Sequence, residues 1–441
     1  MRQTIILTLA IWSVTVSCGS SRPPGLRVDG AIETEMRQIR AIDNHAHPVR
    51  VTAPGETDRD YDALPGDALE DAPLPLPLRP GSPYFPQAWQ ALFGYRYSDA
   101  TPDHLKELHE AKVSIEKQKG DSYPAWVLNQ ANTDIMLANR VAMGRGLPGD
   151  RFKWVPYADM FLLPLNNESM KAQDPDHRAF VGNEELLLKR YLSSAGLGSI
   201  PANLDDYLTF ITHMLEEWKA GGAVALKFEF AYLRDLRISN PQRENAERVF
   251  SIYARSSEPT PDEYKILQDY LFRYIAKEAG RLSMPVHIHC AWGVGGYFLL
   301  GNADPIALDS LFNDPSLRRT KFVMLHGGWP FSREAALLIS KPNVYVDFSL
   351  IEFLTYPAEE ARCIREYLEM APEHVLYGSD ASPIDQNVGW AETAWLGSTK
   401  GRLALGMALT GLVNDGEITT DRAKELAHMV LRENARQLYR F

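Results

Sequence analysis

The sequence predicts a (β/α)₈ barrel, in which eight parallel strands are surrounded by helices. The chain has 441 residues, a length that such barrels reach when their loops carry insertions. It is 45% hydrophobic and 23% charged, as is usual for a globular protein. Eight short apolar runs alternate with helix-length amphipathic stretches, and this alternation favours parallel strands connected by helices.

The first 18 residues predict an export signal. A basic start at Arg2 precedes an apolar run, Ile5 to Ser17, that is too short to span a membrane as a helix. Residues 14–18 resemble a bacterial lipobox, with Thr15 where Leu is usual. Two interpretations remain open: a lipoprotein anchored through a lipidated Cys18, and a plain cleaved signal peptide. Both predict an exported protein, periplasmic or anchored to the membrane.

A linker and a long insertion flank the first strand. Residues 19–31, rich in Ser, Arg, Pro and Gly, are typical of a linker, and residues 32–441 are expected to form one barrel domain. Residues 48–100 are polar and proline-rich, and the alternate prolines from Pro73 to Pro77 exclude a helix or a central strand there. We expect this insertion to cover the site as a lid. The alternative is a surface arm that packs on a neighbouring subunit.

The other elements are expected in order along the chain. Thr101 and Pro102 open a helix, because Thr is a good N-cap and Pro fits the first turn. The long interval between Lys227 and His289 indicates a second insertion, after the fourth strand. Further helices are expected at 205–219, 261–282, 332–340 and 358–370. The strands are expected at 42–47, 134–137, 152–156, 223–228, 285–289, 321–326, 343–347 and 374–378.

Chemically matched side chains stand where these strands end. Because the strand ends of a parallel barrel meet at one rim, residues far apart in sequence are expected to face each other there. His45 and His47 share one side of a strand, and imidazole is a common ligand of zinc and similar metals. We therefore expect a site for a divalent metal ion, most naturally zinc. The candidate metal ligands or proton-transfer groups are His45, His47, Lys227, His289, His326 and Asp380.

Several neighbouring residues have structural alternatives. His287 is expected one layer lower in the barrel, as a buried hydrogen-bonded histidine, and Asp347 as an acid that caps a helix or supports a ligand. Arg234, with Arg237, follows the fourth strand, where it binds a substrate carboxylate or is an ordinary surface residue. No disulfide is expected between Cys290 and Cys363.

The rim residues together resemble those of the amidohydrolase superfamily of metal-dependent barrels. Residues 325–331, 344–349 and 377–381 are similar to its amidohydrolase-related branch (amidohydrolase 2), which includes nodulin-like domains and aminocarboxymuconate-semialdehyde decarboxylase. Residues 417–439 are similar to the family's closing helix. The resemblance runs from about residue 32 to the end and is weakest in the insertion.

The resemblance implies hydrolysis by metal-activated water. An ion held by His45, His47 and Asp380 lowers the pKa of its bound water to about 7. Asp380 then takes the proton and returns it to the leaving group, while His326 polarises the substrate carbonyl. In two-metal members the lysine at the position of Lys227 is a carbamate that bridges the ions. In mononuclear relatives it stays unmodified and meets a substrate carboxylate, with His326 as acid or base.

Three classes of function remain. The leading one is a hydrolase that cleaves a C–N or C–O bond of a small molecule; the second is a mononuclear decarboxylase; the third is a non-catalytic binding lipoprotein. A net charge of −11 and a pI near 5.5 argue against nucleic acid as a partner. The resemblance also implies a homo-oligomer.

Overall fold

The computed structural model describes residues 27–441 except 54, 255 and 256. The predicted export signal and Cys18 lie outside the described residues. Each of the eight expected strands is present within the described part, all of them parallel to their neighbours. The strands are β1 Ala41–Ala46, β2 Thr133–Asn139, β3 Phe152–Val155, β4 Leu226–Phe228, β5 Val286–His289, β6 Phe322–Leu325, β7 Val344–Asp347 and β8 Val375–Leu376.

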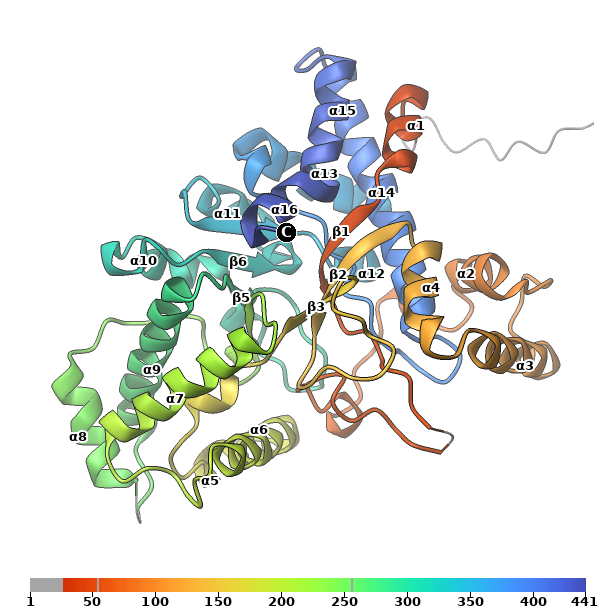
Figure 1. Ribbon diagram of the computed structural model, residues 1–441. Coiled ribbons are helices and arrows are strands. Elements are labelled where there is room, and N and C mark those ends of the chain that lie inside the picture. The colour runs from red at the N-terminus through yellow and green to blue at the C-terminus, as the bar shows by residue number, and fades with distance from the viewer. Residues whose placement is uncertain (1–26, 54, 255–256) are drawn as a thin grey trace, which may run out of the picture.

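The strands form a closed ring. Three pair in the order β1-β2-β3 and five in the order β4 to β8. At the seam between β3 and β4, the Lys227 N–H donates to the Pro156 carbonyl at 2.9 Å. At the seam between β8 and β1, the Asn44 N–H donates to the Tyr377 carbonyl at 2.8 Å, and Ala46 bridges to Ala381. Both gaps are therefore bonded, and the predicted barrel is confirmed (Figure 1).

Helices surround this ring. In Figure 1, α7, α8 and α9 lie on one side of the strands, α2, α3 and α4 on the other, and α13 to α16 lie with α1 near the end at which β1 begins. The four helices expected at 205–219, 261–282, 332–340 and 358–370 are confirmed as α7, α9, α11 and α13. The helices are α1 Gly30–Gln38, α2 Tyr84–Phe93, α3 Pro102–Lys119, α4 Tyr123–Gln130, α5 Glu168–Lys171, α6 Pro175–Ser194, α7 Leu204–Ala220, α8 Arg243–Tyr253, α9 Pro261–Arg281, α10 Asp309–Phe312, α11 Ser332–Leu338, α12 Ile351–Leu354, α13 Pro357–Met370, α14 Trp390–Asn414, α15 Thr420–His428 and α16 Asn434–Tyr439.

Apolar side chains fill the barrel, and the end of the chain closes one mouth. Ile42, Leu137 and Leu376 belong to one buried cluster inside the ring, which Tyr439 and Phe441 join from the last helix and the tail. The tail lies at the end where the strands begin, because the Asn434 amide of α16 donates to the carbonyl of Val375, the first residue of β8, at 2.8 Å. Figure 1 marks the C-terminus beside α16. The opposite end, where the strands finish, is left open.

The insertion after β1 has two parts. Residues 61–78 have little regular structure beyond two short 3₁₀ turns, and their side chains line the cavity at the open end. The expected lack of helix there is confirmed. The second part forms α2, whose Phe85, Trp89 and Phe93 pack into a separate apolar cluster on the barrel's flank. The aromatic residues therefore anchor the insertion and do not cover the site.

Two further insertions extend the barrel. The one expected after β4 is present as α8, in addition to α9. Another, after β3, was not predicted, and it contributes α5 and α6 before α7. No helix among the described residues is both long enough and apolar enough to cross a membrane. Cys290 and Cys363 are buried free thiols, as expected.

Candidate metal centre and active-site cavity

A cavity of about 640 Å³ opens at the end of the barrel where the strands finish. This volume is within the range of small-molecule sites. The six rim residues predicted from the sequence all line it, together with residues 61–78 of the insertion. The predicted rim set is His45, His47, Lys227, His289, His326 and Asp380.

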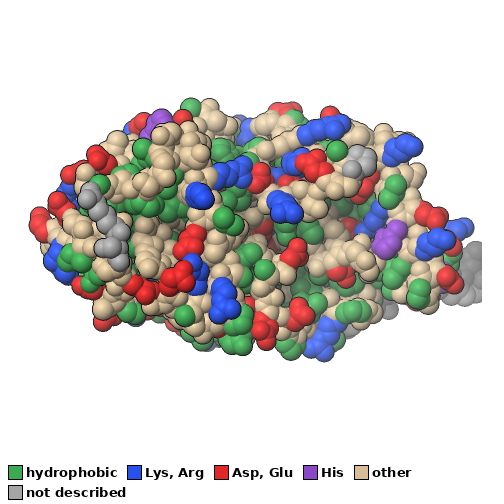
Figure 2. Space-filling view, turned by 90° about the horizontal axis from the view of Figure 1, so that it is seen from below, with side chains coloured by type: hydrophobic (Ala, Val, Ile, Leu, Met, Phe, Trp, Pro, Cys, Tyr) green, Lys and Arg blue, Asp and Glu red, His purple; other side chains and the backbone are tan. Residues whose placement is uncertain are grey.

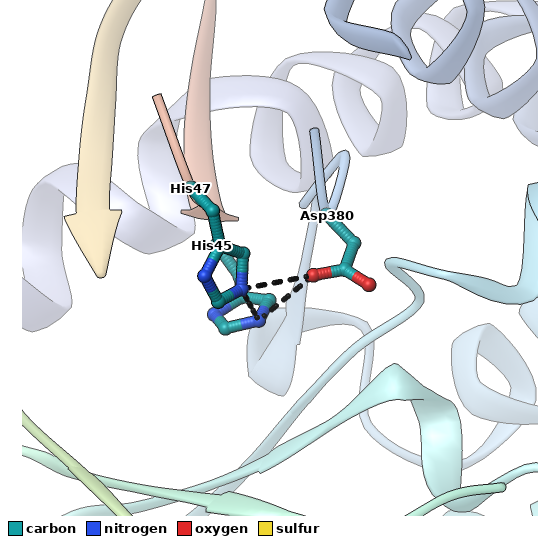
Figure 3. A group of neighbouring side chains, drawn as sticks. All are labelled: His45, His47 and Asp380. Atoms are coloured by element: carbon teal, nitrogen blue, oxygen red, sulfur yellow. Dashed lines mark hydrogen bonds and ion pairs between the residues drawn. The ribbon is translucent and has the colours of Figure 1, made fainter. Parts of the chain in front are cut away.

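Three of these side chains converge on one point (Figure 3). His45 Nε2 lies 3.1 Å and His47 Nε2 3.3 Å from Asp380 Oδ1, and the two nitrogens are 3.3 Å apart. Ligands about 2.0–2.1 Å from a tetrahedral ion are themselves separated by roughly 3.3 Å. Two imidazoles and a carboxylate are also a donor set that suits zinc and similar divalent metals. The residues present therefore fit the metal that the sequence predicts.

Burial and charge favour the metal-binding form of His45 and Asp380. Burial, followed by the nearby Lys227 ammonium, lowers the pKa of His45 to about 3, so its imidazole is neutral and able to bind a metal. Burial alone would raise the pKa of Asp380, but His326 and the hydrogen bonds from His45 and His47 bring it well below its usual value. Asp380 is therefore a carboxylate at neutral pH.

The backbone is strained at two rim positions. His326 has φ of 64° and Asp380 has φ of 46°. Both lie in the left-handed region, which costs a residue other than glycine roughly 1–2 kcal/mol. At Asp380 the strain accompanies a local hydrogen-bond pattern, because its N–H donates to the His45 carbonyl at 2.8 Å. Strain of this kind collects at functional sites, where the surroundings enforce it. Here it turns the carboxylate toward the paired histidines.

Asp62, from the insertion, holds the outer side of His47. Its Oδ2 lies 3.1 Å from His47 Nδ1, and its Oδ1 accepts a 2.6 Å hydrogen bond from the Tyr157 hydroxyl. That hydroxyl is also 3.0 Å from His47 Nδ1. Burial lowers the pKa of His47, but Asp62 and Asp380 outweigh it and raise the pKa to about 10. A carboxylate behind a ligand histidine fixes the orientation of the ring.

The other three predicted ligands border the triad. The rings of His45 and His326 are 4.9 Å apart, and those of His326 and His289 are 4.7 Å apart. His289 Nε2 lies 3.1 Å from the Ala291 carbonyl, and His326 Nδ1 lies 2.9 Å from the Ser349 hydroxyl. Lys227 is almost fully buried and lines the same cavity. These three side chains, which come from β4, β5 and the end of β6, therefore line the part of the cavity wall next to the triad.

Arg234 is not at the site, which corrects the expectation that it binds substrate. Its guanidinium donates to Asp269 at 2.7 Å and to Gln268 at 3.2 Å, both on α9, and it does not line the cavity. Its acidic partner, Asp269, lies 35 positions later in the chain, so the residues near Arg234 in the sequence do not reveal the ion pair. Its role is to fasten the loop after β4 to α9.

Hydrogen-bonded residues support the rim from below. Asp347 accepts from the His326 N–H at 2.9 Å and from the Asn44 amide at 2.7 Å, so it supports a rim residue, as expected, and does not line the cavity. His287 is fully buried one layer lower, 2.6 Å from the Tyr439 hydroxyl, also as expected. The participation of Tyr439 could not be read from the sequence, because the tail's position depends on the closed barrel.

Three residues of the site were missed: Asp62, Tyr157 and Glu229. Tyr157 lies just past β3, a strand end that could have been examined in the same way as the others. Glu229 stands two positions after Lys227 and lines the cavity with a buried carboxyl. Burial and the nearby Asp62 raise its pKa well above the usual value. Asp62 lies in irregular structure, where no periodicity indicates which side chain turns inward.

Comparison with known proteins supports the sequence resemblance. The family model described as Amidohydrolase matches residues 244–441, which contain His289, His326 and Asp380. Protein fluG of Emericella nidulans is 28% identical over 228 residues, which are 49% of this chain and 25% of that protein. The chain thus spans about a quarter of the length of this curated relative.

Solved structures share the fold of the whole chain. A proposed metal-dependent hydrolase from Lactobacillus casei ATCC 334 superposes with a TM-score of 0.65 at 18% identity, covering 93% of this chain and 97% of its own. Uronate isomerase from Thermotoga maritima gives a TM-score of 0.59 at 13% identity, covering 82% and 79%. At these identities the likeness concerns the fold. Residues 244–441 therefore match the Amidohydrolase family, and the whole chain shares its fold with the metal-dependent hydrolase from Lactobacillus casei.

Proposed function

We propose that the protein uses a divalent metal, most naturally zinc, to hydrolyse a C–N or C–O bond of a small molecule. One observation carries the proposal: His45, His47 and Asp380 converge with the spacing of metal ligands, at the floor of an open cavity of about 640 Å³. The matched family supports a hydrolase, and the cavity has the size for a small molecule.

The residues have distinct roles in this proposal. His45, His47 and Asp380 would hold the ion, which when bound lowers the pKa of water and polarises a carbonyl. Asp380, an anion at neutral pH, accepts the proton of the attacking water and passes it to the leaving group. His326, whose pKa burial lowers well below the usual value, stays neutral. Because the Ser349 hydroxyl donates to Asp347, His326 Nδ1 donates to Ser349, and its Nε2 is left to accept a proton or a hydrogen bond as a base.

A decarboxylase is the second candidate, and Lys227 is the observation that favours it. It is the one Lys or Arg among the described residues that line the cavity, so an unmodified Lys227 could hold a substrate carboxylate. A carbamate on Lys227 with two bound ions would favour hydrolysis; a free amine with one ion would favour the lyase.

Metal analysis combined with turnover assays tests the proposal. The purified protein is expected to carry a divalent metal, and His45→Ala and Asp380→Asn to lose most of it together with activity on a panel of amides and esters. His213→Ala, at an exposed position on α7, is the matched control and should keep both. A metal-loaded parent that turns over carboxylic acids with release of carbon dioxide, and neither amides nor esters, would support the decarboxylase instead.

Export is a separate proposal, carried by the sequence alone. Mass spectrometry of the mature N-terminus, after expression in a bacterial host, is expected to show either a lipid-modified Cys18 or cleavage nearby. A chain that retains residues 1–18 in the mature protein would contradict it.

A further inference from the structure

We propose that the substrate carries a cationic group, such as a primary ammonium, and that Glu229 and the acidic rim of the insertion bind this group while the reacting bond lies at the triad. The inference rests on the proposed function, since it names the class of substrate for the same cavity.

The described residues that line the cavity carry many more acids than bases. These residues include one lysine, Lys227, and six side chains with a carboxyl group. Two are already engaged, because Asp380 contacts the paired histidines and Asp62 contacts His47 and Tyr157. The remaining carboxyl groups belong to Asp67, Glu70, Asp71 and Glu229.

Glu229 is the deepest of the four. It is 3% exposed, and its Oε1 has no hydrogen-bond partner among the described residues. Its backbone N–H donates to the Asp159 carboxylate at 2.9 Å, which fixes the main chain and leaves the Glu229 side chain to the cavity. A buried carboxyl oxygen without a partner is costly, and an N–H donor on the ligand would remove that cost.

Three acids form the outer rim. Asp67, Glu70 and Asp71 belong to the insertion, are exposed, and make no side-chain ion pair with any described residue. Figure 2 shows that acidic, basic and apolar side chains are mixed over the face seen from below, without one dominant charge. Among the described residues that line the cavity, carboxyl groups outnumber the one lysine, and attraction to a cation is strongest beside the buried Glu229, where water screens charge least.

Aromatic rings stand among these acids. Tyr61, Tyr232, Trp292 and Phe353 line the same cavity. The faces of aromatic rings attract ammonium groups, more strongly where water is excluded. Carboxylates combined with aromatic faces form a wall that accepts a cation attached to an apolar chain. The same wall would repel a substrate with several carboxylates, because six carboxyl groups line it.

Three hydroxamates that share a metal-binding group test this directly. The probes are the hydroxamic acids of 6-aminohexanoic acid, heptanoic acid and adipic acid (the monohydroxamate), which end in ammonium, methyl and carboxylate. Calorimetric titration of the metal-loaded protein is expected to rank them ammonium, methyl, carboxylate, with at least a tenfold step between the first two. Because the readout is binding, it does not depend on turnover.

Variants assign the preference to the proposed groups. Glu229→Gln should reduce the ammonium-over-methyl ratio at least fivefold, and the double variant Glu70→Gln/Asp71→Asn should reduce it about two- to threefold without a risk to folding, since both residues are exposed. Asp421→Asn, an exposed acid on α15, is the control and should leave the ratio unchanged.

The outcomes separate this inference from the proposed function. Equal affinities, a preference for carboxylate, or no binding of the ammonium probe would overturn the cation inference. If the ammonium probe ranks first but no amide or ester is hydrolysed, the binding inference stands and hydrolysis is refuted.

Discussion

At the scale of single residues, the proposed metal ligands depend on partners that do not touch the proposed metal position. His45 has a buried Nδ1 without a hydrogen-bond partner among the described residues, whereas His47 has Asp62 and Tyr157 behind its ring. The two histidines are therefore fixed by different means: His45 by packing inside the strand, His47 by a contact from the insertion. A change in the insertion should act on the metal site through His47.

Asp62→Asn is expected to weaken metal binding roughly 10- to 100-fold, because an amide orients the His47 ring less firmly than a carboxylate does. Competition with a chromophoric chelator measures the dissociation constant without any substrate. Asp421→Asn is the control, since Asp421 is an exposed acid on α15 and does not line the cavity. An unchanged dissociation constant in Asp62→Asn would refute this role.

At the scale of elements, α14 packs tightly against the segment that carries Asp380. A Cβ added at Gly397 would lie 2.8 Å from the Ser379 Cβ and 3.1 Å from Glu352 Oε1. Ser379 is itself tied to β1, because its N–H donates to Asp43 at 2.9 Å. The close approach of helix and strand end therefore requires glycine at this point of the helix.

Gly397→Ala should lower the free energy of unfolding by about 1–3 kcal/mol, the usual cost of overpacking. Gly411→Ala in the same helix should raise it by about 0.5–1 kcal/mol, because its Cβ meets no atom closer than Arg365 Nη1 at 3.4 Å and alanine favours the helix. Denaturant titration of both variants measures the difference. The same sign for both would show that the contact with Ser379 is not decisive.

At the scale of the whole molecule, the sequence predicts the architecture better than the site's contacts. All eight strands were predictable, since buried parallel strands are short apolar runs whatever their neighbours. His45, His47 and Asp380 were predictable because the barrel brings strand ends together. The partner of Arg234 and the inward turn of Asp62 were not, because both depend on loops whose course no local pattern specifies.

The interior also contains a buried carboxyl group whose titration should make the free energy of unfolding depend on pH. Glu360 is fully buried, and neither carboxyl oxygen has a hydrogen-bond partner among the described residues. Burial raises its pKa to about 8, against the opposing effect of the Lys400 ammonium. The folded protein therefore holds a proton on Glu360 that the unfolded chain releases near pH 4 to 5.

Stability should consequently fall as the pH rises from about 5 to 8, by up to roughly 1.4 kcal/mol per pH unit for this group, and level off above its folded pKa. Glu360→Gln should lose this part of the slope, whereas Glu359→Gln, a half-exposed neighbour on α13, should keep it. Unfolding of metal-free protein followed by denaturant at several pH values measures the slopes. Parallel slopes for parent and Glu360→Gln would contradict the assignment.

The seam between β8 and β1 has a consequence for how the protein acquires its metal. Asp43 and Ser379, which are bonded across it, are 336 positions apart, and the metal ligands lie on either side of the same join. A growing or unfolded chain offers two histidines without their carboxylate, so capture of the ion has to wait until nearly the whole chain is made and folded. Once bound, the ion would link the first strand of the barrel to the segment after the last strand and so stabilise their contact.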